Sequence, residues 1–104
     1  MNPPPLISIV VPTLNQARFI EQTLASIAGQ NWPRTEILVI DGGSTDGTRE
    51  IVERYAHVVT HFISEPDRGQ ADAINKGFRL ARGDILAWLN SDDYYLPLAL
   101  QRAA

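Results

Sequence analysis

The chain lacks cysteine entirely, and this absence excludes disulfide bonds, zinc–thiolate sites and thiol nucleophiles. Lysine and arginine number only 9 against 12 acidic residues, which gives a net charge of −3, and the basic residues are scattered along the chain. A general nucleic-acid-binding surface needs clustered basic residues, so we expect no nucleic-acid partner.

Long apolar runs are missing as well. No run approaches the roughly 20 residues that a membrane span needs, and the first residues, Met1-Asn2-Pro3-Pro4-Pro5, show no basic region followed by an apolar stretch. We therefore expect neither a transmembrane segment nor a signal peptide. A cytoplasmic location is the resulting expectation, and peripheral contact with the inner face of the membrane stays open.

The residues that are present fit one globular domain with an α/β fold. The 104 residues are 44% hydrophobic and 20% charged, an ordinary balance for a chain that buries a core, and we expect a single domain over residues 1–104. Short apolar runs rich in β-branched residues predict strands, and stretches of helical periodicity separate them. The expected strands are 6–11, 36–40, a segment within 58–64, and 85–89.

This order, β-α-β-α-β-α-β, predicts an open, Rossmann-like and mostly parallel sheet covered by helices on both faces. Proline at position 12 should end the first strand. Asn15 should cap the first helix, and Ser44 or Asp46 the second. Apolar spacing predicts that Phe19 lies on the buried face of the first helix.

We expect the third helix to begin near Gln70 and Gly83 to end it, and its predicted buried stripe holds Ala71, Ile74, Phe78 and Ala81. Trp88 should pack inside the buried fourth strand.

Ligands bind at the carboxyl ends of strands in open α/β sheets. The residues that follow each predicted strand are therefore the candidates for chemistry, and all four loops carry polar or charged groups. They are Thr13 and Asn15 after the first strand, 41–43 after the second, Glu65, Asp67 and Arg68 after the third, and Asn90, Asp92 and Asp93 after the fourth.

Each of these features has a functional and a structural interpretation. Adjacent carboxylates at Asp92 and Asp93 suit Mg²⁺ or Mn²⁺ held together with a diphosphate, or else one caps a turn and the other is solvated. Asp41 can accept a hydrogen bond from a ring N–H or a ribose hydroxyl, or simply precede a turn at two glycines. Arg68 suits a phosphate, or else a surface ion pair. Lys76, in the third helix, should face solvent.

Three familiar motifs are missing from the sequence. It has no Gly-x-x-x-x-Gly-Lys-Ser/Thr phosphate loop, no Gly-x-Gly-x-x-Gly after the first strand and no Gly-x-Ser-x-Gly elbow. Kinase-like, dehydrogenase and hydrolase functions therefore lose support.

Taken in order, five segments resemble the family two glycosyltransferases, which adopt the GT-A fold. The resemblance spans about residues 7 to 95, and the five segments together are specific although each is weak alone. They are 8–15, 37–48, 65–70, 75–77 and 83–93, the last ending in Asn90-Ser91-Asp92-Asp93.

The resemblance implies transfer of a sugar from a nucleotide-diphosphate sugar to an acceptor, with inversion and with Mn²⁺ or Mg²⁺ as cofactor. It implies that Thr13, Asn15 and Asp41 contact base and ribose. Arg68 joins these residues as a candidate nucleotide contact. In the family's Asp-x-Asp motif the first position is here Asn90, which can still bond to ribose, and Asp92 should hold the cation, with Asp93 as a further candidate.

The resemblance also places the family's catalytic base well downstream of this motif. The sequence ends soon after it, in a stretch (98–104) that reads like the start of a helix. We therefore expect a donor-binding portion, truncated before the acceptor half and inactive alone. Uncovered apolar surface in such a portion favours self-association.

Two other functions compete with this prediction. The first is a non-catalytic nucleotide-binding or interaction module of the same fold. The second is a metal-dependent phosphatase or nucleotidyltransferase, which we rank low because phosphatases with a nucleophilic Asp place it after the first strand, where this chain has Pro12-Thr13-Leu14-Asn15. The donor sugar, the nucleotide base and the acceptor are not identified by the sequence.

Overall fold

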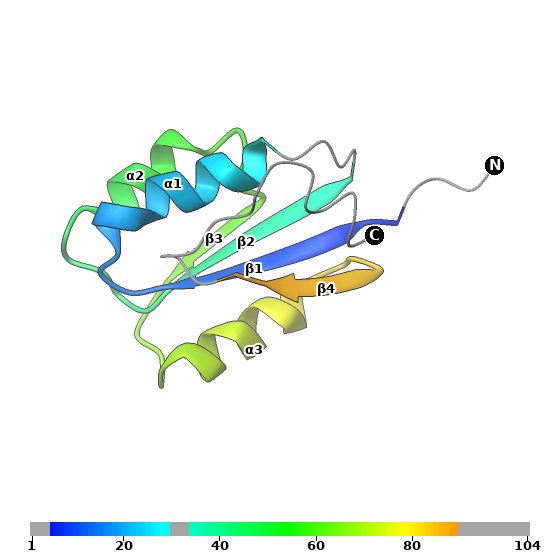
Figure 1. The fold of residues 1–104 in the computed structure, drawn as a ribbon. Coiled ribbons are helices and arrows are strands. Elements are labelled where there is room, and N and C mark those ends of the chain that lie inside the picture. Colours follow the sequence, from blue (N-terminus) through cyan, green and yellow to red (C-terminus); the bar gives the residue numbers. More distant parts are fainter. Residues whose placement is uncertain (1–4, 30–33, 90–104) are drawn as a thin grey trace.

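The structure is a computed structural model that describes residues 5–29 and 34–89. Strands and helices alternate in these residues as the sequence predicts (Figure 1). The elements are β1 (Ile7–Thr13), α1 (Ala17–Ala28), β2 (Thr35–Asp41), α2 (Thr48–Arg54), β3 (His61–Ser64), α3 (Gln70–Leu80) and β4 (Ile85–Trp88).

The strands form one sheet in the order β3-β2-β1-β4, and every neighbouring pair is parallel. Helices α1 and α2 lie on one face of this sheet and α3 lies on the other (Figure 1). The predicted open, Rossmann-like α/β layer is therefore confirmed. No helix in the described ranges is both long and apolar enough to cross a membrane.

The strand order reverses direction at β1. From β1 the chain adds β2 and then β3 on one side, and then crosses to place β4 on the other side of β1. Such a reversal is the point at which open α/β sheets bind ligands, just outside the carboxyl ends of the strands. The fold thus directs attention to the residues that follow Thr13 and those that follow β4.

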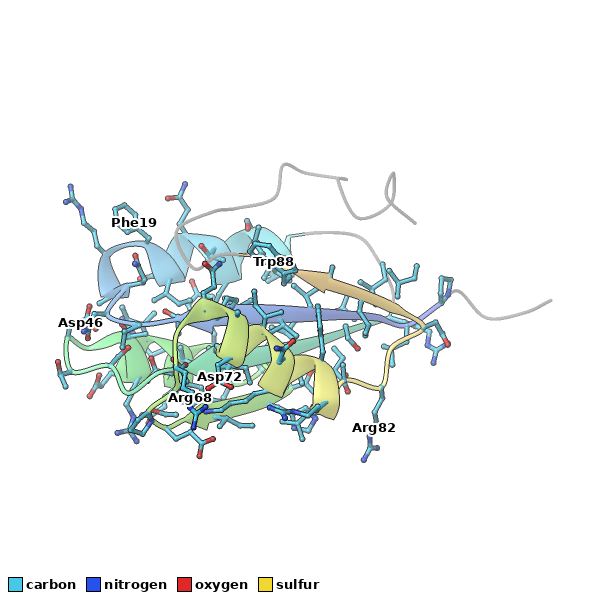
Figure 2. The ribbon with its side chains drawn as sticks, turned by 90° about the horizontal axis from the view of Figure 1, so that it is seen from below. Phe19, Asp46, Arg68, Asp72, Arg82 and Trp88 are labelled. Atoms are coloured by element: carbon cyan, nitrogen blue, oxygen red, sulfur yellow. The ribbon has the colours of Figure 1, made fainter. Side chains whose placement is uncertain are left out.

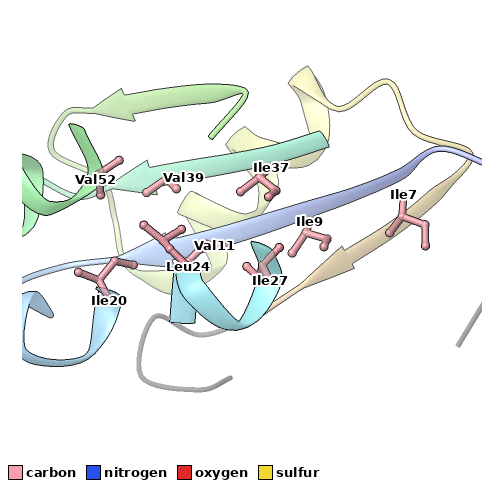
Figure 3. Packing of buried hydrophobic residues seen from close by; sticks show 9 residues of the cluster. All are labelled: Ile7, Ile9, Val11, Ile20, Leu24, Ile27, Ile37, Val39 and Val52. Carbon is pink, nitrogen blue, oxygen red and sulfur yellow. The ribbon is translucent and has the colours of Figure 1, made fainter. Parts of the chain in front are cut away.

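Alternate residues of the central strands fill two cores. One core lies under α1 and α2, and Figure 3 shows how its aliphatic side chains interlock between helix and sheet. The smaller core lies under α3, where Val10, Leu38 and Ile40 meet Ala73. Burial on both faces explains why these strands are apolar almost without interruption. The residues of the first core are Ile7, Ile9, Val11, Ile20, Leu24, Ile27, Ile37, Val39 and Val52.

The fully buried stripe of α3 is shifted by one residue from the predicted stripe, although Phe78 and Ala81 still pack, partly buried, against the smaller core. The helix buries Ala73 and Gly77, whereas Ala71 is exposed and Ile74 and Phe78 are half-buried. A Cβ added to Gly77 would lie only 2.5 Å from Val10 Cγ1. The glycine therefore lets the helix backbone pack directly on β1, and this contact sets which side of α3 faces inward.

Proline 12 does not end β1, contrary to the prediction. In a parallel strand, alternate residues bond to opposite neighbours: Val10 O accepts from Leu89 N beside β4, and Thr13 O accepts from Gly42 N beside β2. Position 12 therefore turns its nitrogen toward β4, whose pairing in the described residues ends at the Val10–Trp88 pair. The backbone N–H that proline lacks is therefore not needed for the β1–β4 pairing among the described residues, and β1 continues to Thr13.

Two predicted core aromatics are exposed instead. Trp88 is 47% exposed and Phe19 is 40% exposed. In the described sheet β4 has a neighbour on one side alone, so side chains on it meet no further strand. Phe19 points away from the sheet (Figure 2), and the Arg18 guanidinium carbon lies 5.5 Å from its ring centroid.

Candidate functional site

The loops after β1, β2 and β3 meet at one edge of the sheet. Gly42 N donates to Thr13 O at 2.9 Å, and Glu65 N donates to Asp41 O at 2.9 Å. These bonds extend the parallel pairing just past the strand ends. Thr13 and Asp41 are the last residues of β1 and β2, and Asn15 and Arg68 lie in the loops after β1 and β3. The candidates Asn90, Asp92 and Asp93 lie outside the described residues.

Asp41 is completely buried at the end of β2. Its Oδ2 accepts hydrogen bonds from Ser44 N at 3.0 Å and from Ser64 Oγ at 2.7 Å. Its Oδ1 accepts a further bond from the Ser44 hydroxyl. Bonds to a charged carboxylate are worth about 1.5–3 kcal/mol each. Asp41 therefore ties the turn after β2 to the end of β3.

The turn that Asp41 holds depends on its two glycines in different ways. Gly43 has φ 100°, a left-handed conformation that glycine adopts without steric cost. Gly42 has an ordinary backbone, but a Cβ there would lie 2.9 Å from Asp67 Oδ2. The missing side chain at Gly42 therefore makes room for the Asp67 carboxylate from the loop before α3.

Side chains from the loop before α2 and from the first residue of α2 cap the start of α1. Asn15, predicted to be the cap, precedes the helix at φ 52°, and no side chain of the N-cap residue Gln16 bonds to the helix. Gln16 N instead donates to Thr48 Oγ1 at 3.1 Å, and Ala17 N donates to Asp46 Oδ2 at 3.1 Å. The prediction missed this because the partners lie about 30 residues away in sequence.

The two loops also bond in the reverse direction. Thr45 N donates to Asn15 Oδ1 at 2.9 Å, and Asn15 N donates to Ser44 Oγ at 2.8 Å. Ser44 passes this connection to Asp41 through its own hydroxyl. We call residues 15–17 and 44–48 with these bonds the interloop clasp, and it makes the entrances of α1 and α2 one unit.

Asp46 is the titratable group of this clasp. The Thr48 hydroxyl, 2.5 Å from Asp46 Oδ1, is the main reason that the pKa of Asp46 lies below its ordinary value. The N–H groups of Ala17 and Thr48 act in the same direction, while partial desolvation opposes them. Asp46 also fills part of its predicted capping role, because it accepts from Thr48 N, although the N-cap residue of α2 is Gly47.

Thr13 brings an unsatisfied polar atom to this edge. Its side chain is 6% exposed, and its Oγ1 has no hydrogen-bond partner among the described residues. It pairs with Asp41 in the parallel register. A buried hydroxyl without a partner is uncommon in folded proteins, and such groups are often found at functional sites.

The loop before α3 is held by a small charged network. Lys76, predicted to face solvent, is 20% exposed, and its Nζ lies 3.2 Å from Glu65 Oε1 and 3.9 Å from Asp72 Oδ2. Lys76 also donates to Pro66 O at 3.3 Å. Asp72 in turn accepts from Arg68 N at 2.9 Å (Figure 2). The i,i+4 spacing of Asp72 and Lys76 was the available sequence signal.

The opposite edge of the sheet carries a polar cluster that the sequence did not indicate. Buried Glu36 accepts from Ser8 Oγ and from Arg82 N, each at 2.9 Å, and Ser8 Oγ accepts from Gly83 N at 2.8 Å. These bonds fix the α3–β4 connection against β1 and β2. They lie at the amino ends of the strands, so we assign them a structural role.

No group of three His, Cys, Asp or Glu in the described ranges is arranged to hold a metal ion. One hollow of about 260 Å³ lies between α2 and β3, away from the carboxyl ends of β1 and β2, and its lining is mainly apolar. The interloop clasp, the Asp41 turn and the α3 entrance therefore remain the candidate site.

Comparison with known proteins identifies the family to which the chain belongs. The glycosyl transferase family 2 model matches residues 8–104. The putative teichuronic acid biosynthesis glycosyltransferase TuaG of Bacillus subtilis is 39% identical over 86% of the chain, which covers 36% of that protein. The chain thus spans about a third of the length of the curated relatives it matches.

Two solved structures share the fold closely. The mannosyltransferase PcManGT from Pyrobaculum calidifontis, in complex with GDP-Man and Mn²⁺, is 35% identical with a TM-score of 0.84, over 90% of this chain and 29% of that one. S. aureus TarS 1–349 in complex with UDP-GlcNAc is 31% identical with a TM-score of 0.86, over 94% and 30%. The chain belongs to glycosyl transferase family 2 and has the GT-A fold that its sequence predicts.

Proposed function

We propose that this chain binds the donor of an inverting glycosyltransferase, which moves a sugar from a nucleotide-diphosphate sugar to an acceptor. The observation that carries the proposal is the convergence of the Asp41 turn, the β1 end and the α3 entrance at the carboxyl edge of the sheet. The nucleotide sugars bound by the two similar structures, GDP-Man and UDP-GlcNAc, support this ligand class.

Four described residues have proposed roles in this site. Thr13 offers a hydroxyl that has no hydrogen-bond partner among the described residues, and Asn15 offers its amide N–H₂, since its Oδ1 already accepts from Thr45 N. Both suit acceptor atoms of a base or ribose. The exposed Arg68 guanidinium suits the diphosphate. Asp41 belongs to the site as the group that holds its turn in shape.

The cation would be held by residues that follow β4 in the sequence. Asp92 and Asp93 offer carboxylate oxygens, and oxygen donors are the set that Mn²⁺ and Mg²⁺ prefer. We assign Asp92 to the cation first, with Asp93 beside it, and Asn90 to the ribose. A bound cation neutralises the negative charge that builds on the departing diphosphate.

Inversion at the anomeric carbon requires a general base that takes the proton of the acceptor hydroxyl. The family resemblance places that base downstream of the Asp-x-Asp motif, and we assign it to no residue of this chain. Transfer of sugar from a nucleotide sugar by these 104 residues alone would contradict this assignment.

Calorimetry and saturation-transfer NMR test the proposal with a panel of UDP, GDP and their sugars in the presence of Mn²⁺. We expect weak binding of one nucleoside diphosphate that disappears on chelation and in Asp92→Ala. Glu53→Gln, an exposed change on α2, is the control and should bind normally. If no nucleotide binds with the metal present, the proposal fails and a non-catalytic interaction module becomes the better interpretation.

A further inference from the structure

We propose that Asp67, rather than Asp41, supplies the carboxylate that contacts the nucleoside of the donor. Asp67 lies in the loop between β3 and α3, next to Arg68. The inference rests on the proposed function and deepens it, because it names the residue that recognises the base.

Asp41 is poorly placed for contact with a ligand. Its residue surface is 0% exposed, and both carboxylate oxygens already accept hydrogen bonds from Ser44 or Ser64. Its side chain lies on the same side of β2 as Ile37 and Val39, which face α1 and α2. A ligand that bonded to Asp41 would have to displace the serine donors, which would open the turn after β2.

Asp67 lies on the other side of the same turn. A Cβ on Gly42 would be 2.9 Å from Asp67 Oδ2 and 3.2 Å from Oδ1. The carboxylate therefore fills the space that a side chain at position 42 would occupy, directly beyond the end of β2. The fold thus brings an acidic group to this position from a distant loop, while the residue that is local to the turn has no side chain.

One carboxylate oxygen of Asp67 is positioned and the other is open. Oδ1 accepts from Gly69 N at 2.9 Å, whereas no donor among the described residues bonds to Oδ2. The side chain is half-buried, so solvent and ligand can reach it. The Lys76 network holds the surrounding loop, and a positioned acceptor binds its donor with little loss of side-chain freedom.

An ionised carboxylate only accepts hydrogen bonds, so it recognises a donor on the ligand. A nucleoside offers two kinds, the ring N–H of a base such as uracil or guanine and the hydroxyls of ribose. Both would bond to Oδ2, and a charge-assisted bond of this kind is short and strong. We propose that the donor is the ring N–H of the base. Arg68, next to Asp67, is then available to bind the diphosphate, which lies at the other end of the ribose from the base.

The test uses the 104-residue chain, Mn²⁺ and either UDP or GDP, whichever binds. Asp67→Asn keeps an oxygen that can accept from Gly69 N but replaces the free acceptor with a donor, so folding should be preserved. We expect it to weaken binding about ten- to a hundredfold with an unchanged unfolding midpoint. Glu53→Gln, on the exposed surface of α2, should leave affinity and midpoint unchanged.

Ligand analogues separate the two donors. A nucleoside diphosphate that carries a methyl group on the ring nitrogen should bind the wild-type chain about ten- to a hundredfold more weakly than the unmodified nucleotide. Its affinity should fall little further in Asp67→Asn, because the methyl group and the substitution remove the same hydrogen bond. The 2′-deoxy analogue should lose a similar factor in both proteins. Asp41→Asn should lower the unfolding midpoint and still discriminate against the methylated analogue.

Three results would overturn the inference. Equal nucleotide affinity of wild type and Asp67→Asn removes Asp67 from the site while leaving the proposed function intact. If the 2′-deoxy analogue, and not the methylated one, loses little further affinity in Asp67→Asn, then Asp67 contacts the ribose hydroxyl and not the ring N–H. Absence of any nucleotide binding by the wild-type chain refutes the proposed function, and the inference falls with it.

Discussion

Replacement of Gly77 by alanine tests whether the stability of the fold depends on the close contact between α3 and β1. The added Cβ would lie 2.5 Å from Val10 Cγ1 and 2.6 Å from Cγ2, whereas ordinary van der Waals contacts begin at 3.4 Å. Val10 is fully buried in the central strand and its χ1 is restricted, so it cannot turn aside. The α3 helix must therefore move outward by about 1 Å.

Two opposing effects decide the magnitude. Alanine is favoured over glycine inside a helix by about 1 kcal/mol. Overpacking of a buried contact costs about 1–3 kcal/mol, and the clash with two methyl groups places this site near the upper value. We expect the free energy of unfolding to fall by about 2 kcal/mol, which lowers the midpoint of thermal unfolding by roughly 8–16 °C for a domain of this size.

Thermal and urea unfolding followed by circular dichroism measure the change. Gly29→Ala is the matched control, because Gly29 has φ −78° and its nearest added contact would be 3.4 Å, so its stability should change little. Val10→Ala should restore part of the stability when combined with Gly77→Ala, although it is destabilising alone. A Gly77→Ala chain as stable as the wild type would refute the reasoning.

Three further predictions concern the charged and apolar groups around the site. Lys76→Met removes the ion-pair partner of Glu65 at the α3 entrance, so we expect weaker nucleotide binding in calorimetry. The free energy of unfolding should fall by no more than about 1 kcal/mol, because the ion pair is partly exposed. Unchanged nucleotide affinity would show that the network does not position the loop. The pKa of Asp46 is lowered from 3.8, mainly by the Thr48 hydroxyl, so the stability that ionised Asp46 contributes is complete above that value and is lost as the pH falls below it. In Asp46→Asn, the free energy of unfolding should therefore fall less steeply as the pH is lowered through this range. An identical pH dependence in the variant and the wild type would contradict the assignment. Leu86 is 48% exposed on β4, so we expect concentration-dependent self-association by light scattering that Leu86→Lys reduces; a strictly monomeric mass at high concentration would argue against it.

Local sequence determined the order of the elements. Short apolar, β-branched runs form β1 to β4. Where helices cover both faces of a strand, nearly every residue of that strand is apolar, so the strand can be recognised from its own sequence. Glycine and proline at the breaks act through the backbone of their own residues. Parallel strands then had to bring their following loops to one edge, so the convergence of these loops was also predictable.

Local rules failed where a second element decided the outcome. Pro12 continues its strand because its nitrogen faces the side of β1 beyond the described β4 pairing. Phe19 and Trp88 have the residue types of a core but lie where no described element covers them. The start of α1 is capped by Asp46 and Thr48 rather than by Asn15. Each outcome depends on contacts between residues far apart in sequence.

The chemistry of the site divides in the same way. The sequence by itself determined which polar residues follow the strands, because a strand end and the loop after it are adjacent along the chain. Tertiary structure alone decided which carboxylate is enclosed and which is open. Asp41 is enclosed because Ser64 comes from the neighbouring strand, and Asp67 reaches the turn because Gly42 leaves space for it. Burial and hydrogen bonding are properties of the packed chain, and no single segment carries them.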